Sequence, residues 1–387
     1  MKNLLMLLLM ALLVVPIMPA QAQDDDLNAL KQEVIQTYAD IVYANYADSH
    51  ALALELQAAI EAFVADPADE TLQAAKDAWL VAREPYGQTE AFRFYGGPID
   101  DADGPEGLLN AWPLDEVYID YVEGMPEAGI INDLATYPEI TAELIESLNE
   151  QGAEENISVG FHAIEFLLWG QDLSADSAGQ RPVSDYTTAP NAERRAQYLT
   201  IATDLLVNHL TEMVEAWAPD MEDNYRAEFL ALEPDTALAH ILTGIGVLSK
   251  SELAGERIFT AYDNQDQEDE HSCFSDNTHR DIINNAQGIA NVYRGTYTRV
   301  DSTVVSGAGL TDLMAAVDPA LNETVLAQLD LTLELVNSIH VPFDQAIVLP
   351  ESRSQIVEVV FGLQDQGDMF VEVAISLGLT IDTALPE

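Results

Sequence analysis

The feature that most constrains this fold is a helical spacing of apolar residues, which recurs along almost the whole chain. Leucine, isoleucine, valine and aromatic side chains return every three or four residues in one segment after another, as they do in amphipathic helices. Alternation with period two, the pattern of a half-buried strand, is confined to weak fragments such as residues 303–305. The sequence therefore predicts an all-α protein made of helical bundles.

Turn and capping residues separate the expected helices. Ser49 is placed to cap a second helix, Pro85 to bend a third, and residues 96–115 contain enough turn residues for a long loop. The predicted helical ranges are 27–47, 49–66, 70–95, 138–149, 157–169, 192–217, 236–262, 278–293, 311–317, 321–338 and 354–377.

Length and internal similarity predict two domains. A chain of 387 residues is long for one domain, because domains commonly hold ~100–200 residues. Both halves show the order long helix, polar loop, helix, which is the pattern that an ancient duplication would leave. We expect an N-terminal helical bundle over residues 23–218, which carries the motif GFHAIE, and a C-terminal helical bundle over residues 219–387.

Residues 1–22 are typical of a signal peptide. Lys2 provides the charged start, an apolar run follows, and Ala20-Gln21-Ala22 is a small-x-small cleavage sequence. We expect cleavage after Ala22 and a periplasmic or secreted protein. The remaining apolar runs are shorter than the ~20 residues that a span needs, so no transmembrane segment is expected in the mature chain.

Charge excludes nucleic acid as a partner. The chain has 67 acidic and 15 basic residues, which gives a net charge of −52 and a field that repels phosphates. An acidic surface adapted to high salt accounts for this excess, because ions screen the self-repulsion. The single cysteine, Cys273, permits no intrachain disulfide.

The motif GFHAIE, residues 160–165, lies in a segment that is otherwise almost wholly apolar. On a helix His162 and Glu165 share a face, because positions i and i+3 lie one above the other. A buried imidazole and a buried carboxylate both need partners. A metal ion would use both as ligands, and the alternative is a core pair that hydrogen-bonds to itself or to backbone.

A metal needs more than two protein ligands, and carboxylates from facing helices are the usual source. Glu90 is the first choice for a third ligand, because it lies among aromatic residues on a predicted helix. The alternative is that Glu90 pairs with Arg83 or Arg93. Glu84, beside the predicted bend, is a weaker candidate for the same role.

A second group of potential ligands crowds the segment 268–281. Its members are His271, Cys273, Asp276, His279 and Asp281. The cysteine would suit zinc or copper, whereas the carboxylates suit iron or calcium. The alternative is a hydrogen-bonded loop in which Asp276 or Asn277 caps the helix that begins near Thr278.

The motif does not match a zinc peptidase. Such enzymes need His-Glu-x-x-His or its inverted form, His-x-x-Glu-His, which supply two metal-binding histidines. Here Phe166 stands where the inverted form has its second histidine. Peptidase activity would therefore need ligands from elsewhere in the chain.

Several long segments resemble the imelysin family. Gly160, His162 and Glu165 match its Gly-x-His-x-x-Glu signature, and similar blocks are REPYGQTEAFRFYGGPID, GPEGLLNAWPLDEVYIDYV and NQDQEDEHSCFSDNTHRDIINNAQGIANVYRG. The last of these is similar to the iron-regulated protein A subgroup. The resemblance implies an extracytoplasmic, all-helical, two-domain protein linked to iron uptake, in a family commonly classed among metallopeptidases. It carries over His162 and Glu165 as the motif pair, with Gly160, Arg83 and Glu84 as supporting residues, and implies a site between the domains.

Two functions compete on these grounds. The first is capture of a metal ion, with iron favoured and zinc or copper as alternatives, for presentation to a membrane iron-uptake component. The second is a metal-dependent peptidase that uses His162 and Glu165. We favour the binding protein over the enzyme and expect a monomer, and a scaffold with a purely structural motif is the third alternative.

Overall fold

The computed structural model describes residues 20–386, and it confirms the all-α class. Helices account for most of this part of the chain. The strands described in it are β1 (Thr296–Thr298) and β2 (Val304–Ser306), which pair antiparallel with Tyr297 opposite Val305. The weak strand fragment predicted at 303–305 thus falls on β2. Residues 1–19, which hold most of the expected signal peptide, lie outside the described range.

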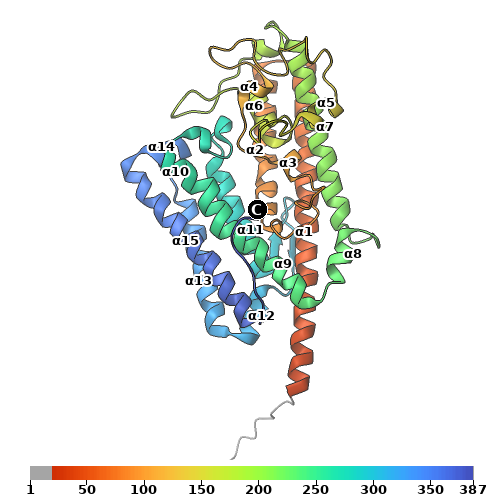
Figure 1. The fold of residues 1–387 in the computed structure, drawn as a ribbon, viewed down its shortest axis with the longest axis vertical. Helices are drawn as coiled ribbons and strands as arrows, with labels where there is room; N and C mark the ends of the chain where they lie inside the picture. The colour runs from red at the N-terminus through yellow and green to blue at the C-terminus, as the bar shows by residue number, and fades with distance from the viewer. Residues whose placement is uncertain (1–19, 387) are drawn as a thin grey trace, which may run out of the picture.

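Helix α1 (Ala20–Ala65) is a single helix of 46 residues, about 69 Å long. It runs along most of the long axis of the molecule (Figure 1). The expected break at Ser49 is wrong, because this buried hydroxyl donates a 3.0 Å hydrogen bond to the carbonyl of Asn45, one turn earlier. A serine satisfied in this way needs no helix terminus.

Helix α2 (Asp69–Thr89) passes through Pro85 and ends earlier than the predicted residue 95. A 3₁₀ turn, η1 (Glu90–Phe92), follows it, and Phe94 then has a left-handed φ of +72°. The chain therefore turns away at the point where Glu90 stands.

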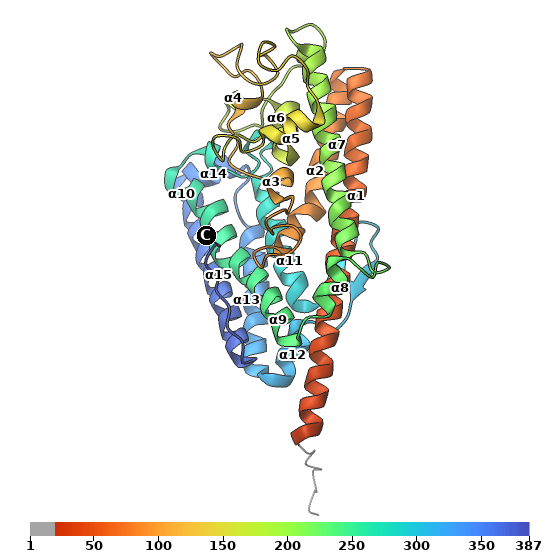
Figure 2. The same ribbon diagram turned by 45° about the vertical axis from the view of Figure 1, so that its right-hand side comes forward.

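The first half of the chain packs α1, α2 and α7 side by side, as both views show (Figures 1 and 2). Helix α6 contacts α2 and α7, and all of its ten residues are buried. The other elements of this half are α3 (Glu106–Leu109), α4 (Glu116–Ile119), α5 (Ala142–Leu148), α6 (Gly160–Trp169), η2 (Val183–Tyr186), α7 (Ala192–Trp217) and α8 (Tyr225–Leu230).

In the second half, the helix expected at 236–262 is formed by three consecutive segments. These are α9 (Pro234–Val247), the π-helix η3 (Leu248–Phe259) and α10 (Thr260–Asn264). π-Helical turns are rare and are frequently found at functional sites. The remaining elements are η4 (Gln267–Asp269), η5 (Cys273–Ser275), α11 (Thr278–Arg294), α12 (Leu310–Val317), α13 (Pro319–Asn337), α14 (Phe343–Val348) and α15 (Pro350–Ser376).

The two halves meet where α2 packs against α11. A Cβ added at Gly288 would lie 2.4 Å from the carbonyl oxygen of Gln88, so only glycine permits this approach. Figure 1 shows the helices of the second half, teal to blue, stacked beside the lower part of α1 and α2. The predicted domain division between residues 218 and 219 stays a prediction.

None of the helices in the described range 20–386 is long and apolar enough to cross a membrane.

A buried ion-pair cluster fixes the irregular loops of the first half to α7. Asp120 has no exposed surface and accepts hydrogen bonds from Nε and Nη2 of Arg195, at 2.6 and 2.9 Å. Arg181 donates to the same carboxylate at 2.8 Å. Burial raises the pKa of Asp120, but Arg195 and Arg181 outweigh it and hold this pKa below its usual range.

Replacement Asp120→Asn should lower the free energy of unfolding by about 3–5 kcal/mol at neutral pH, because it leaves buried guanidinium groups without their counter-charge. The loss should be fully present above the unfolded pKa of 3.8. It should shrink as the pH falls through the lower folded pKa, where the native carboxylate is also protonated. Urea unfolding at several pH values measures this, with the exposed Asp220→Asn as the control. Equal losses in both variants would contradict the assigned role.

Candidate metal centre

Gly160 begins α6 because no other residue fits there. Its φ is +86°, and an added Cβ would lie 2.7 Å from the carbonyl oxygen of Leu109 at the end of α3. Side chains rarely adopt this backbone conformation. The glycine of the motif therefore sets the position from which the next two turns of α6 project His162 and Glu165.

His162 and Glu165 form a hydrogen-bonded pair inside the protein. They are 1% and 0% exposed, and His162 Nδ1 lies 2.9 Å from Glu165 Oε2. The other carboxylate oxygen, Oε1, accepts from the backbone N–H of Ser275 at 2.9 Å and from its hydroxyl at 2.7 Å. Both oxygens of Glu165 are thus engaged, one within α6 and one by the second half of the chain.

The second ring nitrogen of His162, Nε2, is buried and has no hydrogen-bond partner among the described residues. Two aromatic rings enclose His162. The ring of His271 lies 4.5 Å away, centroid to centroid, at an interplanar angle of 74°, and that of Trp112 lies 4.9 Å away. His271 Nδ1 is also unpartnered, 3.4 Å from Asp281 Oδ2. The loop after η4 therefore brings a second imidazole to the motif.

Burial controls the charge of this pair. It lowers the pKa of His162 well below its usual range, and positive charge on His271 and Arg83 would lower it further. Burial also raises the pKa of Glu165 to about 8, against the hydrogen bonds from Ser275. Both imidazoles are neutral at pH 7, because burial and Arg257 lower the pKa of His271 as well. Neutral imidazole is the form that coordinates metals.

A buried polar network extends from His271 into the first half of the chain. Asp281 accepts from Arg83 through Nε at 3.2 Å and Nη2 at 3.0 Å. Arg83 in turn donates to Asn110 Oδ1, and Asn110 donates to Glu90 Oε1 at 3.2 Å. This chain of hydrogen-bonded partners holds Asp281 beside His271.

Glu90 is engaged by guanidinium groups. Its Oε2 accepts from Arg257 at 2.6 Å and from Arg93 at 2.7 Å. Burial raises the pKa of Glu90, but Arg257 and Arg93 outweigh it and lower this pKa to about 2. Arg257 stands on the π-helix η3, where Glu252 accepts its Nε at 2.9 Å. Both oxygens of Glu90 are therefore occupied by protein donors.

A pocket of about 490 Å³ leads to His271 and Trp112. Arg93 and Arg257 line this pocket together with six carboxylate side chains. These acidic residues are Glu106, Glu150, Glu154, Glu252, Glu256 and Asp269. An acidic wall of this kind concentrates cations at the site.

The remaining predicted residues separate in the structure. Cys273 is buried, and burial raises the pKa of its thiol well above its usual range, which keeps it in the form that binds metals poorly. His279 Nδ1 lies 3.2 Å from the carbonyl of Asp276, and Glu84 pairs with Arg280 at the half-exposed surface. Asp276 is grouped with Asp172 and Asp344.

Trp112, Asn110 and Ser275 were not identified as site residues from the sequence. Trp112 borders the pocket and packs on both histidines. The available signals were its place in the turn-rich stretch 96–115 and, for Ser275, the adjacent ligand-rich segment.

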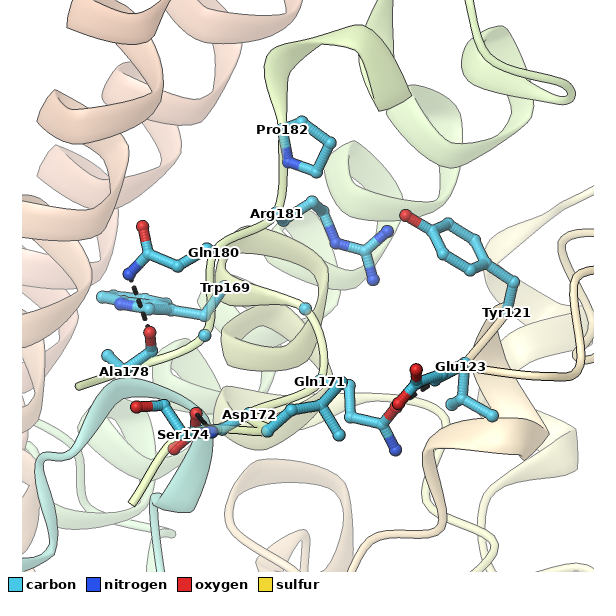
Figure 3. A pocket seen from close by; sticks show the side chains of 14 residues that line it. Tyr121, Glu123, Trp169, Gln171, Asp172, Ser174, Ala178, Gln180, Arg181 and Pro182 are labelled. Carbon is cyan, nitrogen blue, oxygen red and sulfur yellow. Dashed lines mark hydrogen bonds between the residues drawn. The ribbon is translucent and has the colours of Figure 1, made fainter. Parts of the chain in front are cut away.

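A separate pocket of about 420 Å³ lies beyond the C-terminal end of α6. Figure 3 shows Tyr121 and Arg181 on one side of it, Trp169 on another, and Asp172 beside Ser174 at one end. The residues that line it do not include His162, His271 or Trp112, so it is distinct from the pocket above.

The family model described as Imelysin, whose name classes it among peptidases, matches residues 42–368. The chain belongs to the imelysin family. Residues of the matched range include the whole site around His162, and the resemblance inferred from the sequence is confirmed.

Individual relatives agree with this membership. The chain is similar to Iron-regulated protein A of Synechococcus elongatus, at 29% identity over 275 residues, which is 69% of this chain. The match spans 65% of that relative's length. Among solved structures, a protein classed as an iron-regulated protein A precursor from Parabacteroides distasonis aligns with a TM-score of 0.67 at 22% identity, over 89% of this chain and 95% of its own. An imelysin-like protein from Psychrobacter arcticum aligns with a TM-score of 0.66 at 14% identity, over 92% and 98%. These structures support the shared fold.

Replacement Gly160→Ala should destabilise this imelysin-family protein by more than backbone strain alone. A side chain at this φ costs of order 1–3 kcal/mol, and the contact with Leu109 adds to that cost. Gly124→Ala is a matched control, because its φ is +80° and an added Cβ would meet nothing within 4 Å. Thermal or urea unfolding compares the two. Equal losses would show that the approach of α3 does not constrain α6.

Proposed function

We propose that this protein binds a metal ion outside the cytoplasm, with His162 Nε2 and His271 as ligands, and that it takes part in iron acquisition. One observation carries the proposal. A buried ring nitrogen with no partner costs roughly 1–3 kcal/mol of lost hydrogen bonding. A bound cation would satisfy His162 Nε2, and the same cation would reach the unpartnered nitrogen of the neighbouring His271.

In this proposal Glu165 does not bind the metal but orients the ligand His162. Its Oε2 faces His162 Nδ1 at 2.9 Å, so an ionised Glu165 would hold the proton on Nδ1 and leave Nε2 free to coordinate. Carboxylates in this position orient metal-binding histidines and raise their basicity. Glu165 is then a positioning residue.

Iron is the favoured metal on two grounds. Imidazole suits iron, zinc and copper, and the similar protein from Synechococcus elongatus carries the name Iron-regulated protein A. Zinc or copper would use the same nitrogen atoms and remains the alternative. The acidic residues that surround the pocket would draw any of these cations toward His271.

A metal-dependent peptidase is the alternative function. His271 would supply the second imidazole that Phe166 does not, and a bound water would complete the site. The family name includes this chemistry. We favour binding because His162 has almost no exposed surface, and a peptide bond would need access to the metal.

Purified mature protein should bind one ferrous ion, and His162→Ala and His271→Ala should each weaken this binding at least tenfold, because each removes a ligand. Glu165→Gln should weaken it about 10–100-fold, the usual effect of an orienting partner. Anaerobic titration with Fe²⁺, followed by metal analysis after dialysis, measures this, with the exposed His340→Ala as the control. Iron retained by His162→Ala would refute the proposal. Peptide hydrolysis by the loaded wild-type protein, lost in the same variant, would favour the peptidase.

The proposed location has its own test. Expression in a bacterium should yield a periplasmic protein whose first residue is Gln23, because cleavage after Ala22 removes the apolar segment. Intact-mass analysis of the periplasmic fraction measures this. Ala22→Phe, which places a bulky residue at the cleavage position, should accumulate the uncut chain. Uncut wild-type chain retained in the cytoplasm would contradict the proposal.

A further inference from the structure

Three aspartates from distant parts of the chain converge on one point. Asp172 follows the end of α6, Asp276 follows η5, and Asp344 stands in the first turn of α14. Each offers a carboxylate oxygen, and these three oxygens all lie within 4.8 Å of one another. Asp172 and Asp344 are 3% exposed, and Asp276 is half-buried. Like charges at these separations repel strongly when they are shielded from water.

Asp344 provides a second and independent observation. It is 3% exposed, and no N–H or hydroxyl donor of the described residues reaches either of its oxygens. One oxygen each of Asp172 and Asp276 is unpartnered as well. The fully buried Glu270 meets Asp344 carboxyl to carboxyl, and its Oε2 accepts from Thr278 at 3.0 Å. Buried carboxylates are ordinarily paired or bound to a metal.

The charged neighbours of this group are other acids. The pKa of Asp276 is raised by burial and by the negative charges of Asp344, Asp172 and Asp176. The pKa of Asp172 is raised by burial and by the charge of Asp344. This differs from the site around His162, where Arg83, Arg93 and Arg257 balance the carboxylates. The two clusters have different chemistry, although both involve the segment 270–281.

We propose that Asp172, Asp276 and Asp344, with Glu270 beside them, form a second cation site that binds Ca²⁺. This site is separate from the one at His162 and does not depend on the function proposed above. An ion there would replace the repulsion between carboxylates by attraction to all of them.

The ligand set favours calcium. It consists of oxygen atoms, which suit hard cations, and it contains no imidazole or thiolate of the kind that selects zinc or copper. Ca²⁺ takes six to eight oxygen ligands at 2.3–2.6 Å in flexible geometry, and three carboxylates that converge on one point suit it. Mg²⁺ demands near-octahedral geometry and is usually held by only one or two carboxylates, so this ligand set fits Mg²⁺ less well.

Solvent reaches this group through a hollow of about 470 Å³. Asp172 and Asp344 line it together with Asp266 and Glu268. A hydrated cation would therefore approach through an acidic entrance and exchange its waters for carboxylates at the base. Waters left on the outer side would complete the six to eight oxygen ligands that Ca²⁺ takes.

Calcium at this point would join three segments. Asp276 is adjacent to Ser275, whose N–H and hydroxyl bind Glu165, and Asp172 lies three residues after the end of α6. The ion would thus fix the loop of the second half against the helix that carries His162. We expect Ca²⁺ to raise the melting temperature of the protein.

Calorimetric titration of chelator-treated full chain with CaCl₂ should show one site in 0.3 M salt, where weak binding to the acidic surface is screened. Asp344→Asn and Asp172→Asn should each lower the affinity at least tenfold and abolish the rise in melting temperature. Asp176→Asn is the matched control, since it removes an exposed charge beside the group and should leave both unchanged. His162→Ala should also leave Ca²⁺ binding unchanged, because it belongs to the other site.

Several outcomes would overturn the proposal. These are the absence of a saturable Ca²⁺ site, Asp344→Asn and Asp172→Asn variants that fold by circular dichroism and bind as tightly as wild type, and loss of Ca²⁺ binding in His162→Ala. Tighter binding of Mg²⁺ or Fe²⁺ at the same residues would also refute the assignment to calcium. Loss of iron binding in His162→Ala with calcium binding intact would support two independent sites.

Discussion

The arrangement of the two halves depends on a carboxylate that has no contact with water. Glu165 is hydrogen-bonded to His162 on its own helix, and it accepts from Ser275 in the second half of the chain. If either partner were absent, a buried acid would lose a hydrogen bond worth roughly 1.5–3 kcal/mol. The loop around Ser275 must therefore be in place when α6 is packed. The ring orientation of His162 and the position of His271 follow from the same requirement.

Around this centre, the buried carboxylates of Asp281 and Glu90 are each paired with at least one arginine. Arg83 faces Asp281, and Arg257 and Arg93 face Glu90. These guanidinium groups lie close enough to both histidines to oppose their protonation. The carboxylates, in turn, prevent an uncompensated positive field that would repel a metal. Two neutral imidazoles beside a balanced ionic network are suited to receive a cation without rearrangement of the surrounding side chains.

Local patterns predicted the helices well and the site only in part. The apolar spacing at 192–217 coincides with α7, because one face of that helix is apolar and packs in the core. The helix start predicted at Ser49 is wrong, because its hydroxyl donates to a carbonyl one turn earlier within α1. His162 and Glu165 were recognisable because three residues separate them on one helix. The partner of Glu90, Arg257, is 167 residues away, and no local pattern encodes such a contact. Asp276 has a left-handed φ of +57°, and Asp344 of α14 lies beside it, which the spacing of apolar residues did not reveal.

The contact between two side chains of the π-helix η3 depends on how its backbone is wound. Glu252 and Arg257 are five residues apart and form a direct 2.9 Å contact, which the wider π turn permits. In an α-helix, five residues advance by about 500°, so these side chains would diverge by about 140°. Deletion of one residue within η3 would restore ordinary winding and rotate one part of this helix by about 100° against the other. The π winding of η3 therefore determines where the guanidinium of Arg257 meets Glu90. The number of residues in this helix matters to the site as well as the identity of its side chains.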